Sequence, residues 1–249
     1  MTKGLVSIIM PAFNCADFIL HAIHSVEEQS YTNWELLIVD DCSTDNTREV
    51  VEEVVKKDFR VKLFKLFQNS GAAISRITAL DNANGEYIAF LDSDDVWFPE
   101  KLEKQINFMK ENDIDFSCTA YDKIDESGNK LNKVINVRRK QNYNDVLKTC
   151  PGNSTVIYNI KHIGKVTIPT IRKRNDYVMW LKVIKKANYL HGLDEVLSSH
   201  RIRMGSISSN KFSLVKYHWH VYRKIEKLSL MKSTYLIMYW GIVTVLKLR

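Results

Sequence analysis

Short apolar segments rich in β-branched residues alternate with helical patterns through the first half of this chain, and this alternation limits the folds open to it. Four segments are predicted to be buried strands: Leu5–Met10, Trp34–Val39, Val61–Phe67 and Tyr87–Leu91. Helical patterns follow them: one capped by Asp17, one capped by Ser43 or Thr44 that runs through Glu53, and two at Gly71–Ala83 and Lys101–Asn112. Strands that alternate with helices of this length predict an α/β fold, a doubly wound sheet with helices on both faces.

The pattern changes after Ala120. Here we expect mixed elements: a strand at Asp115–Thr119, a turn at Asp125–Asn129, a short helix at Asn144–Thr149, a strand at Ser154–Tyr158, an amphipathic helix at Asp176–Ala187 and a loop at Arg201–Ser209. Two helices, Lys211–Lys232 and Tyr235–Leu248, are predicted to follow. Because no repeat or flexible linker divides the chain, we predict one domain over residues 1–209 with a helical tail over residues 210–249.

Composition excludes several classes of protein. The 249 residues are 45% hydrophobic and 26% charged, the balance of a globular chain rather than a disordered or fibrous one. The longest apolar run, around Leu236–Leu246, is shorter than the roughly 20 residues that a membrane span needs, and we expect no secretory signal. The four cysteines form no C-x-x-C pair, which predicts free thiols in a reducing cytosol and no structural zinc site.

Basic charge is concentrated near the end of the chain. Residues 201–249 hold ten Lys and Arg residues and one acid, Glu226, so this segment carries +9 and residues 1–200 carry −2. A local basic surface favours an anionic partner, either nucleic acid or the anionic face of a membrane. The alternative is a helix face that is simply solvated.

Acidic clusters stand where two of the predicted strands end. Asp40 and Asp41 follow the second strand, and Asp92-Ser93-Asp94-Asp95 follows the fourth. Ligands of doubly wound sheets bind beyond the carboxyl ends of the strands. Two carboxylates separated by one residue suit Mg²⁺ or Mn²⁺ together with substrate phosphates, although acids at such positions also serve as turn and cap residues.

The chain lacks a glycine-rich phosphate loop. It contains neither G-x-G-x-x-G nor G-x-x-x-x-G-K-[ST], which argues against a Rossmann dehydrogenase and a P-loop NTPase. The charge of a bound nucleotide diphosphate would therefore be met by a metal ion and by basic side chains such as Arg76. The alternative for Arg76 is an ordinary surface arginine on a helix.

Several segments together resemble family 2 glycosyltransferases, enzymes with the GT-A fold. In order they are Val6–Asn14, Trp34–Asp45, the N-x-G-x-x-x-x-R element Asn69–Arg76, the strand and D-x-D of Tyr87–Trp97, Arg174–Leu181 and His200–Ser208. The resemblance covers about residues 5–209. It implies a GT-A catalytic domain with a doubly wound mixed sheet, a nucleotide-binding half of about residues 1–97, an acceptor half of about residues 98–209 and a C-terminal helical extension.

The resemblance also implies roles for individual residues. The nucleotide would be bound by Pro11, Phe13, Asn14, Asp40, Asp41, Asn69, Arg76, Asp92 and Ser93, with Asp41, helped by Asp40, on the uracil ring. Asp94 and Asp92 would hold Mg²⁺ or Mn²⁺. Asp176 would be the general base, although without the resemblance a helix N-cap would be the favoured interpretation. Two positions depart from the family pattern, because Asn175 replaces an acid and His200 replaces a tyrosine.

The predicted activity is an inverting, metal-dependent transfer of a sugar from a nucleotide donor to a glycan acceptor, here expected to be polyprenyl-diphosphate-linked. The donor would be a UDP-hexose or UDP-N-acetylhexosamine and the product a bacterial surface polysaccharide. The alternatives are a nucleotide-binding or nucleic-acid-binding protein of related fold without transferase activity, and a nucleotidyltransferase that makes sugar nucleotides. No nucleic-acid-binding motif is present, so we expect no nucleic-acid partner.

The tail combines basic and aromatic residues, the composition of a helix that lies in a membrane interface. We therefore expect a cytoplasmic enzyme, peripheral at the inner face of the cytoplasmic membrane, whose tail binds the membrane surface. The alternative is that the tail helices cover the domain or form a dimer interface.

Overall fold

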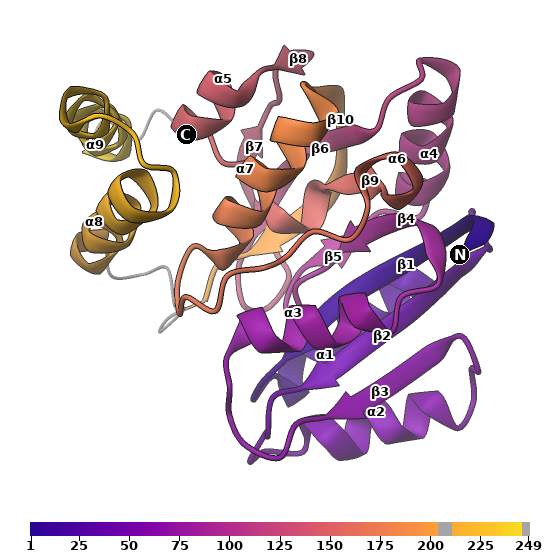
Figure 1. Ribbon diagram of the computed structural model, residues 1–249. Helices are drawn as coiled ribbons and strands as arrows, with labels where there is room; N and C mark the ends of the chain where they lie inside the picture. The colour runs from indigo at the N-terminus through magenta and orange to yellow at the C-terminus, as the bar shows by residue number, and fades with distance from the viewer. Residues whose placement is uncertain (204–210, 246–249) are drawn as a thin grey trace.

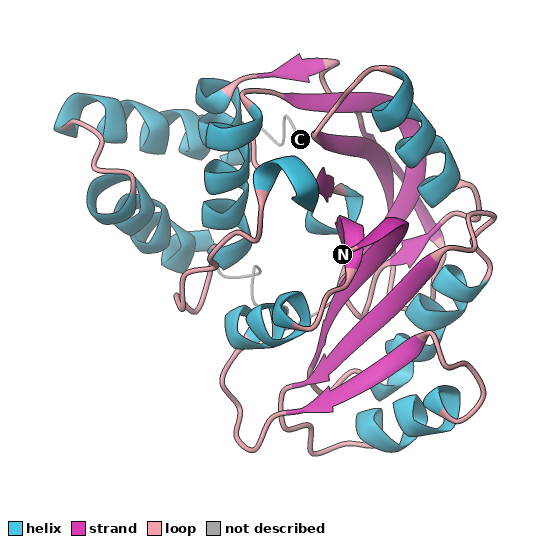
Figure 2. Ribbon diagram, turned by 45° about the vertical axis from the view of Figure 1, so that its right-hand side comes forward, coloured by secondary structure: helices cyan, strands magenta, loops and turns pink. Residues whose placement is uncertain are grey.

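The computed structural model describes residues 1–203 and 211–245, which form a ten-stranded mixed sheet with helices on both faces (Figures 1 and 2). The main path of the sheet runs β3-β2-β1-β4-β9-β6-β10-β5, with β7 on β6 and β8 on β10. The strands are β1 (Thr2–Ala12), β2 (Trp34–Asp40), β3 (Val61–Lys65), β4 (Gly85–Phe90), β5 (Val96–Trp97), β6 (Phe116–Ile124), β7 (Lys130–Ile135), β8 (Lys140–Gln141), β9 (Ile157–Asn159) and β10 (Leu190–Arg201). The predicted doubly wound mixed sheet is confirmed.

Helices in the described part of the chain connect these strands and cover the sheet. They are α1 (Ala16–Glu27), α2 (Thr47–Val55), α3 (Ala72–Asp81), α4 (Lys101–Glu111), α5 (Tyr143–Lys148), the 3₁₀ turn η1 (Asn153–Thr155), α6 (Ile160–Ile163), α7 (Asn175–Ala187), α8 (Lys211–His220), the π-helix η2 (Val221–Ile225) and α9 (Leu230–Val245). The N-caps of α1 and α2 are Cys15 and Asn46, not the predicted Asp17, Ser43 or Thr44.

The strands β3, β2, β1 and β4 are parallel neighbours. Successive residues on a strand point to opposite faces, and both faces here are covered by helices. Ile8 of β1 therefore packs with α1, α2 and α4, whereas its neighbour Ile9 packs with α3 and α7. Burial on both faces explains why these strands are continuous apolar segments in the sequence.

Strand β10, with 12 residues, is the longest strand of the described sheet, and the sequence did not predict it. It pairs in parallel with β6, but the register shifts on either side of Val196. Each shift breaks the alternation of buried and exposed residues by which a strand is detected. The predicted loop Arg201–Ser209 begins at the last residue of β10, and residues 204–209 lie outside the described residues.

The tail contains two main helices, as predicted, but the first does not extend to Lys232. The first, α8, widens into the π-helix η2, and Lys227 then adopts a left-handed backbone with a φ of 53°. The backbone N–H of Leu228 donates to the carbonyl of Tyr222 at 2.9 Å, which closes the turn before α9 begins at Leu230. The expected second helix thus starts five residues before Tyr235, and residues 246–248 of that prediction lie outside the described part.

The tail packs through α9 against α5, and through Tyr222 and Glu226 against α7 (Figure 1). Its buried residues Val221, Tyr222 and Leu236 join the same core as α7. Glu226 forms an ion pair of 2.5 Å with Lys185 of α7, and its side chain is almost fully buried. One face of the tail therefore covers the domain. Among the described residues, no helix has the length and apolar character required to span a bilayer.

Candidate active site

The carboxyl ends of β1, β2 and β4 lie at the same edge of the sheet (Figure 1). Ala12, the last residue of β1, pairs with Asp40, the last residue of β2. Ile9 of β1 pairs with Phe90 at the end of β4. The loops that follow these strands carry most of the predicted site residues, so the fold brings together segments that are far apart in the sequence.

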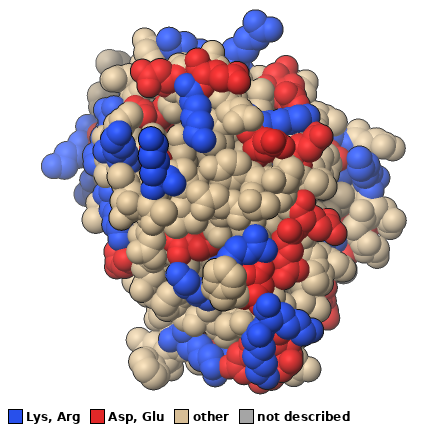
Figure 3. Space-filling model, turned by 90° about the vertical axis from the view of Figure 1, so that its right-hand side faces the viewer, with Lys and Arg blue, Asp and Glu red and all other residues tan. Residues whose placement is uncertain are grey.

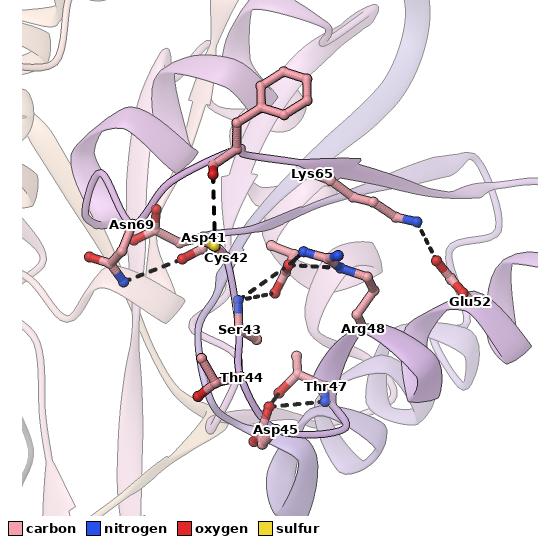
Figure 4. A network of polar contacts seen from close by, with 12 residues as sticks. Asp41, Cys42, Ser43, Thr44, Asp45, Thr47, Arg48, Glu52, Lys65 and Asn69 are labelled. Carbon is pink, nitrogen blue, oxygen red and sulfur yellow. Dashed lines mark hydrogen bonds and ion pairs between the residues drawn. The ribbon is translucent and has the colours of Figure 1, made fainter.

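Asp41 anchors the loop that precedes α3. Its two carboxylate oxygens accept hydrogen bonds from the backbone N–H groups of Ser70 at 2.7 Å and Gly71 at 2.8 Å. The Asn69 side chain donates to the backbone carbonyl of Asp41 at 3.3 Å (Figure 4). Gly71 has a φ of 86°, a conformation that favours glycine. Asp41 and Asn69 are therefore brought together, and each carboxylate oxygen keeps a lone pair for a ligand.

Asp40 faces a different neighbour. Its fully buried carboxylate accepts from Arg48 Nη2 at 2.8 Å and Nε at 3.2 Å, and it also contacts the backbone N–H of Ser43. Figure 4 shows Arg48 reaching from α2 toward the loop at Ser43. These contacts hold the loop against α2, which favours a positioning role for Asp40 over direct contact with a nucleotide.

The loop after β1 is joined to the loop after β2 through Asn14. The Asn14 side-chain oxygen accepts from the backbone N–H of Thr44 at 2.8 Å, and the Asn14 N–H donates to Ser43 Oγ at 3.0 Å. Phe13, next to Asn14, is 45% exposed, and Pro11 is half-buried within β1. An exposed ring on a fixed loop offers an apolar face on which a nucleobase can stack.

Arg76 connects the D-x-D segment to the helix that carries Asp176. Its Nη2 donates to Asp92 Oδ1 at 2.7 Å and its Nη1 donates to Asn175 Oδ1 at 2.8 Å. The same Asp92 oxygen accepts from Asn153 Nδ2 at 2.8 Å. Arg76 is only 6% exposed, so the alternative of an ordinary surface arginine is wrong. Its Nε has no hydrogen-bond partner in the described structure.

Asp94 and Asp95 contact Arg201, the last residue of β10, and Arg203, two residues beyond it. Arg203 Nε is 2.7 Å from Asp94 Oδ2, and the Arg201 backbone N–H donates to Asp95 Oδ1 at 3.0 Å. Burial, together with the neighbouring carboxylates of Asp95 and Asp92, raises the pKa of Asp94 to about 6. Burial and the charge of Asp92 also raise the pKa of Asp95. The cluster therefore carries more negative charge than its surroundings readily stabilise.

This excess of carboxylate oxygen fits a hard divalent cation. The described residues contain no group of three or more ligands that would hold a metal without substrate. Magnesium typically binds through one or two carboxylates plus the phosphates of the substrate, and the Asp92-Ser93-Asp94 segment can supply that number. Ser93 itself is buried between the two acids. The residues present thus fit a metal that binds together with a nucleotide diphosphate.

Asp176 lies in the first turn of α7 and is partly exposed. The N-cap position belongs to Arg174, and Asp176 makes no capping hydrogen bond, so the N-cap alternative is wrong. Among the described residues, no group donates a hydrogen bond to its carboxylate or forms an ion pair with it. Its neighbour Asn175 is buried and bonded to Arg76. The Asp176 carboxylate is thus available to a ligand, next to an Asn175 side chain that is held in place by Arg76.

Sequence reasoning missed four residues that shape this site. Asn153 and Ser154 of η1 bond to Asp92, through the Asn153 side chain and through Ser154 Oγ, which accepts from the Asp92 N–H at 3.1 Å. No motif marks them. Arg201 and Arg203 lie in the segment His200–Ser208, so the family resemblance pointed to the segment but not to these side chains.

Comparison with known proteins identifies the family. Residues 7–166 match the model of glycosyl transferase family 2. The chain is 44% identical to TuaG of Bacillus subtilis (strain 168), assigned to teichuronic acid biosynthesis, over 94% of this chain and 93% of TuaG. It is 40% identical to the Escherichia coli UDP-Glc:alpha-D-GlcNAc-diphosphoundecaprenol beta-1,3-glucosyltransferase WfgD, over 96% of this chain and 93% of WfgD.

A solved structure has the same fold. A fragment of S. aureus TarS in complex with UDP-GlcNAc superposes with a TM-score of 0.75 at 22% identity, over 94% of this chain and 71% of that one. The two structures share the GT-A arrangement of a mixed sheet between helices. The chain therefore belongs to glycosyl transferase family 2 and is a glycosyltransferase with the GT-A fold.

Proposed function

We propose that this enzyme transfers a sugar from a UDP-sugar to a lipid-linked glycan with inversion at the anomeric carbon, in the synthesis of a bacterial surface polysaccharide. The observation that carries the proposal is the free carboxylate of Asp176 next to Asn175, which Arg76 connects to Asp92. The names of two relatives support the polymer and the acceptor: TuaG is assigned to teichuronic acid, and WfgD to a diphosphoundecaprenol-linked sugar.

The general base follows from the chemistry of the acceptor. A sugar hydroxyl is a weak nucleophile until a positioned carboxylate takes its proton as the new bond forms. Asp176 has the exposure and the free lone pairs for this step. Attack by the hydroxyl opposite the departing nucleotide inverts the anomeric carbon, so an α-linked donor gives a β-linked product. The name of WfgD describes such a β linkage from UDP-Glc.

We place the donor on the Asp92 side of Arg76, whereas Asp176 lies on the Asn175 side. We assign the nucleobase to the edge formed by Phe13, Asp41 and Asn69, and the diphosphate to Asp92 and Asp94 through Mg²⁺ or Mn²⁺. When bound, the metal stabilises the negative charge that develops on the departing diphosphate. The buried Arg76 keeps Asp92 oriented toward that position, and Asn14 holds the two nucleobase loops together.

The test measures UDP release from a panel of UDP-sugars. The purified chain is incubated with Mn²⁺ or Mg²⁺, with and without EDTA, and Asp176→Asn is compared with the control Asp17→Asn, an exposed acid in α1. We expect UDP release from one donor. It should be lost with EDTA and reduced by about three orders of magnitude in Asp176→Asn, the middle of the range for loss of a general base. UDP with Mn²⁺ should raise the melting temperature of both variants and of wild type.

Two results would contradict the proposal. Equal activity of Asp176→Asn and wild type would remove the assigned base. Absence of any thermal shift with UDP and Mn²⁺ would remove the assigned donor and metal. If no UDP-sugar releases UDP but UDP with Mn²⁺ still raises the melting temperature, the assay lacks the acceptor that the enzyme requires.

The outer face of the tail supports placement at a membrane. Four residues of α9 form an exposed stripe on one side of the helix, with Met231 83% exposed: Met231, Tyr235, Met238 and Ile242. The nearby lysines Lys224, Lys227 and Lys232 are exposed as well. An apolar stripe with flanking cations is typical of helices that lie on anionic membranes. By contrast, Figure 3, which faces the side opposite the tail, shows both signs of charge intermixed.

A further inference from the structure

We propose that a cavity between the β6–β7 hairpin and α9 binds the diphosphate group of the lipid-linked acceptor; this inference rests on the proposed function. The cavity has a volume of about 700 Å³. Its walls come from β6, β7, the segment Asn136–Arg138, Gln141 of β8, the segment Thr149–Gly152 and the tail residues Tyr239 and Val243. A space of this size is within the range that small-molecule ligands fill.

The charge of the cavity selects an anion. Three cations line it, Lys123, Lys133 and Arg138, and no acidic residue is among the described residues of its wall. Arg138 also forms a long ion pair of 3.4 Å with Asp145, with its side chain 64% exposed, so most of its donors stay available. The donor site is the reverse, a cluster of carboxylates. A diphosphate can therefore bind in this cavity through protein cations alone, without a metal ion.

Two chains of contacts connect the cavity to the acidic cluster. Tyr121 lines the cavity and stacks on His200 with ring centroids 3.9 Å apart, and His200 Nε2 lies 3.6 Å from Asp95. Gly152 also lines the cavity and is followed directly by Asn153, which bonds to Asp92. A ligand in the cavity thus lies next to the groups that hold the donor site in shape.

The helix α9 connects the cavity to the exposed stripe. Tyr239 and Val243 face the cavity, whereas Met238 and Ile242, each one residue earlier, are exposed on the stripe. Adjacent residues of a helix point about 100° apart, so the same helix forms a cavity wall and an outer apolar face. A lipid diphosphate held with its chain along the stripe would present its sugar toward the domain.

The test is a binding titration of the full chain saturated with UDP and Mn²⁺, so that the donor site is occupied. The probe is N-acetylglucosaminyl diphosphate that carries a long alkyl chain. The comparison ligands are inorganic pyrophosphate and the alkyl glycoside of the same sugar without phosphate. We compare wild type with the double variant Lys133→Gln/Arg138→Gln and with the control Lys57→Gln, an exposed lysine next to α2.

We expect the double variant to bind the diphosphate probe about tenfold more weakly, because two charge-assisted contacts are lost, while UDP affinity stays unchanged. The glycoside should bind weakly and equally to all variants, and Lys57→Gln should match wild type. Equal affinity of the double variant for the probe would overturn the inference. Binding of pyrophosphate as tight as the probe would also overturn it, since the site would then be one for free anions.

Failure of the proposed function gives a different result. If UDP and Mn²⁺ do not bind at all, the assignment of the donor site is wrong, and the assignment of the cavity to the acceptor, which depends on it, is wrong as well. If UDP binds and only the probe is insensitive to the cavity variants, the glycosyltransferase proposal stands and this inference alone is wrong.

Discussion

The Arg76 guanidinium donates a hydrogen bond of 2.8 Å to the side chain of Asn175, although the two residues are 99 positions apart. The other end of the guanidinium is 2.7 Å from Asp92. A single buried arginine therefore joins the segment assigned to the metal to the residue before the assigned base. Asn175 stands where the family pattern has an acid, and the hydrogen bond shows that a neutral oxygen can fill the acceptor role.

We predict that Asn175→Leu lowers the stability of the protein by about 1–3 kcal/mol, because it leaves a buried Arg76 N–H group without an acceptor. Asn175→Asp keeps an acceptor at the same place and should retain most of the stability. Chemical denaturation of both variants measures the difference, and kcat should fall in Asn175→Leu while UDP binding persists. Equal stability of the two variants would contradict the bridging role of Arg76.

A second prediction concerns Arg203, which lies 2.7 Å from Asp94. A cation at this carboxylate competes with a divalent ion for the same charge. Arg203→Gln should therefore bind Mn²⁺ about tenfold more tightly than wild type in the presence of saturating UDP. Titration followed by the signal of free Mn²⁺ measures this, with Lys57→Gln as the charge-matched control. Unchanged affinity would show that Arg203 does not occupy the metal position.

The sequence predicted the sheet and helices of the first half because their apolar periods are regular and local. Where an element depends on distant contacts, prediction failed. Strand β10 is interrupted by register shifts around Val196, and the tail helix breaks at Lys227 through a left-handed backbone that no glycine marks. The same holds for predicting the site residues. A local motif marks Asp92 and Asp94, whereas Asn153 bonds to Asp92 from 61 positions away and no local pattern marks it.

Lys101 provides a prediction about pH. It is fully buried in α4, donates to Gln105 Oε1 at 2.6 Å and lies over the Trp97 ring. Burial lowers the pKa of Lys101 from its usual value to about 7. The unfolded chain therefore binds one more proton than the folded chain between about pH 7 and pH 10.5, so this group makes stability rise with pH across that window.

The measurement compares wild type with Lys101→Met by denaturant unfolding at pH 7, 8 and 9. The free energy of unfolding of wild type should increase relative to the variant by up to about 1.4 kcal/mol per pH unit. Below pH 7 the difference should level off, because Lys101 is then protonated in both states. A difference that is flat from pH 7 to pH 9 would contradict the lowered pKa.

Replacing each of two glycines with alanine should change the stability of the protein in opposite directions. A Cβ at Gly152 would lie 2.6 Å from His200 Cε1 and 3.2 Å from Tyr121 Cε1, so Gly152→Ala must displace the stacked pair. We expect a loss of about 1–3 kcal/mol, as for an overpacked site. Gly241 lies within α9 with nothing within 4 Å of its Cβ position, and Gly241→Ala should stabilise by about 1 kcal/mol. Thermal unfolding of both variants checks the signs.

The last prediction separates the two roles of the tail. Removing the whole tail would expose the core that Val221, Tyr222 and Leu236 help to form, so a truncated chain would confuse unfolding with loss of membrane binding. Met238→Glu/Ile242→Glu changes only the exposed stripe. It should leave the melting temperature near that of wild type and weaken binding to vesicles of anionic lipid by about tenfold or more, since apolar burial is lost and acidic charge is added.

Co-sedimentation with anionic and with neutral vesicles measures this binding. The control is Glu53→Gln/Glu103→Gln, which alters two acids of α2 and α4, helices that cover the other face of the sheet (Figure 1). Wild type and control should bind anionic vesicles in a salt-dependent manner, because screening weakens the contribution of the lysines beside the stripe. Equal sedimentation of the stripe variant and wild type would mean that α9 does not contact the membrane and that the tail acts only by covering α5 and α7.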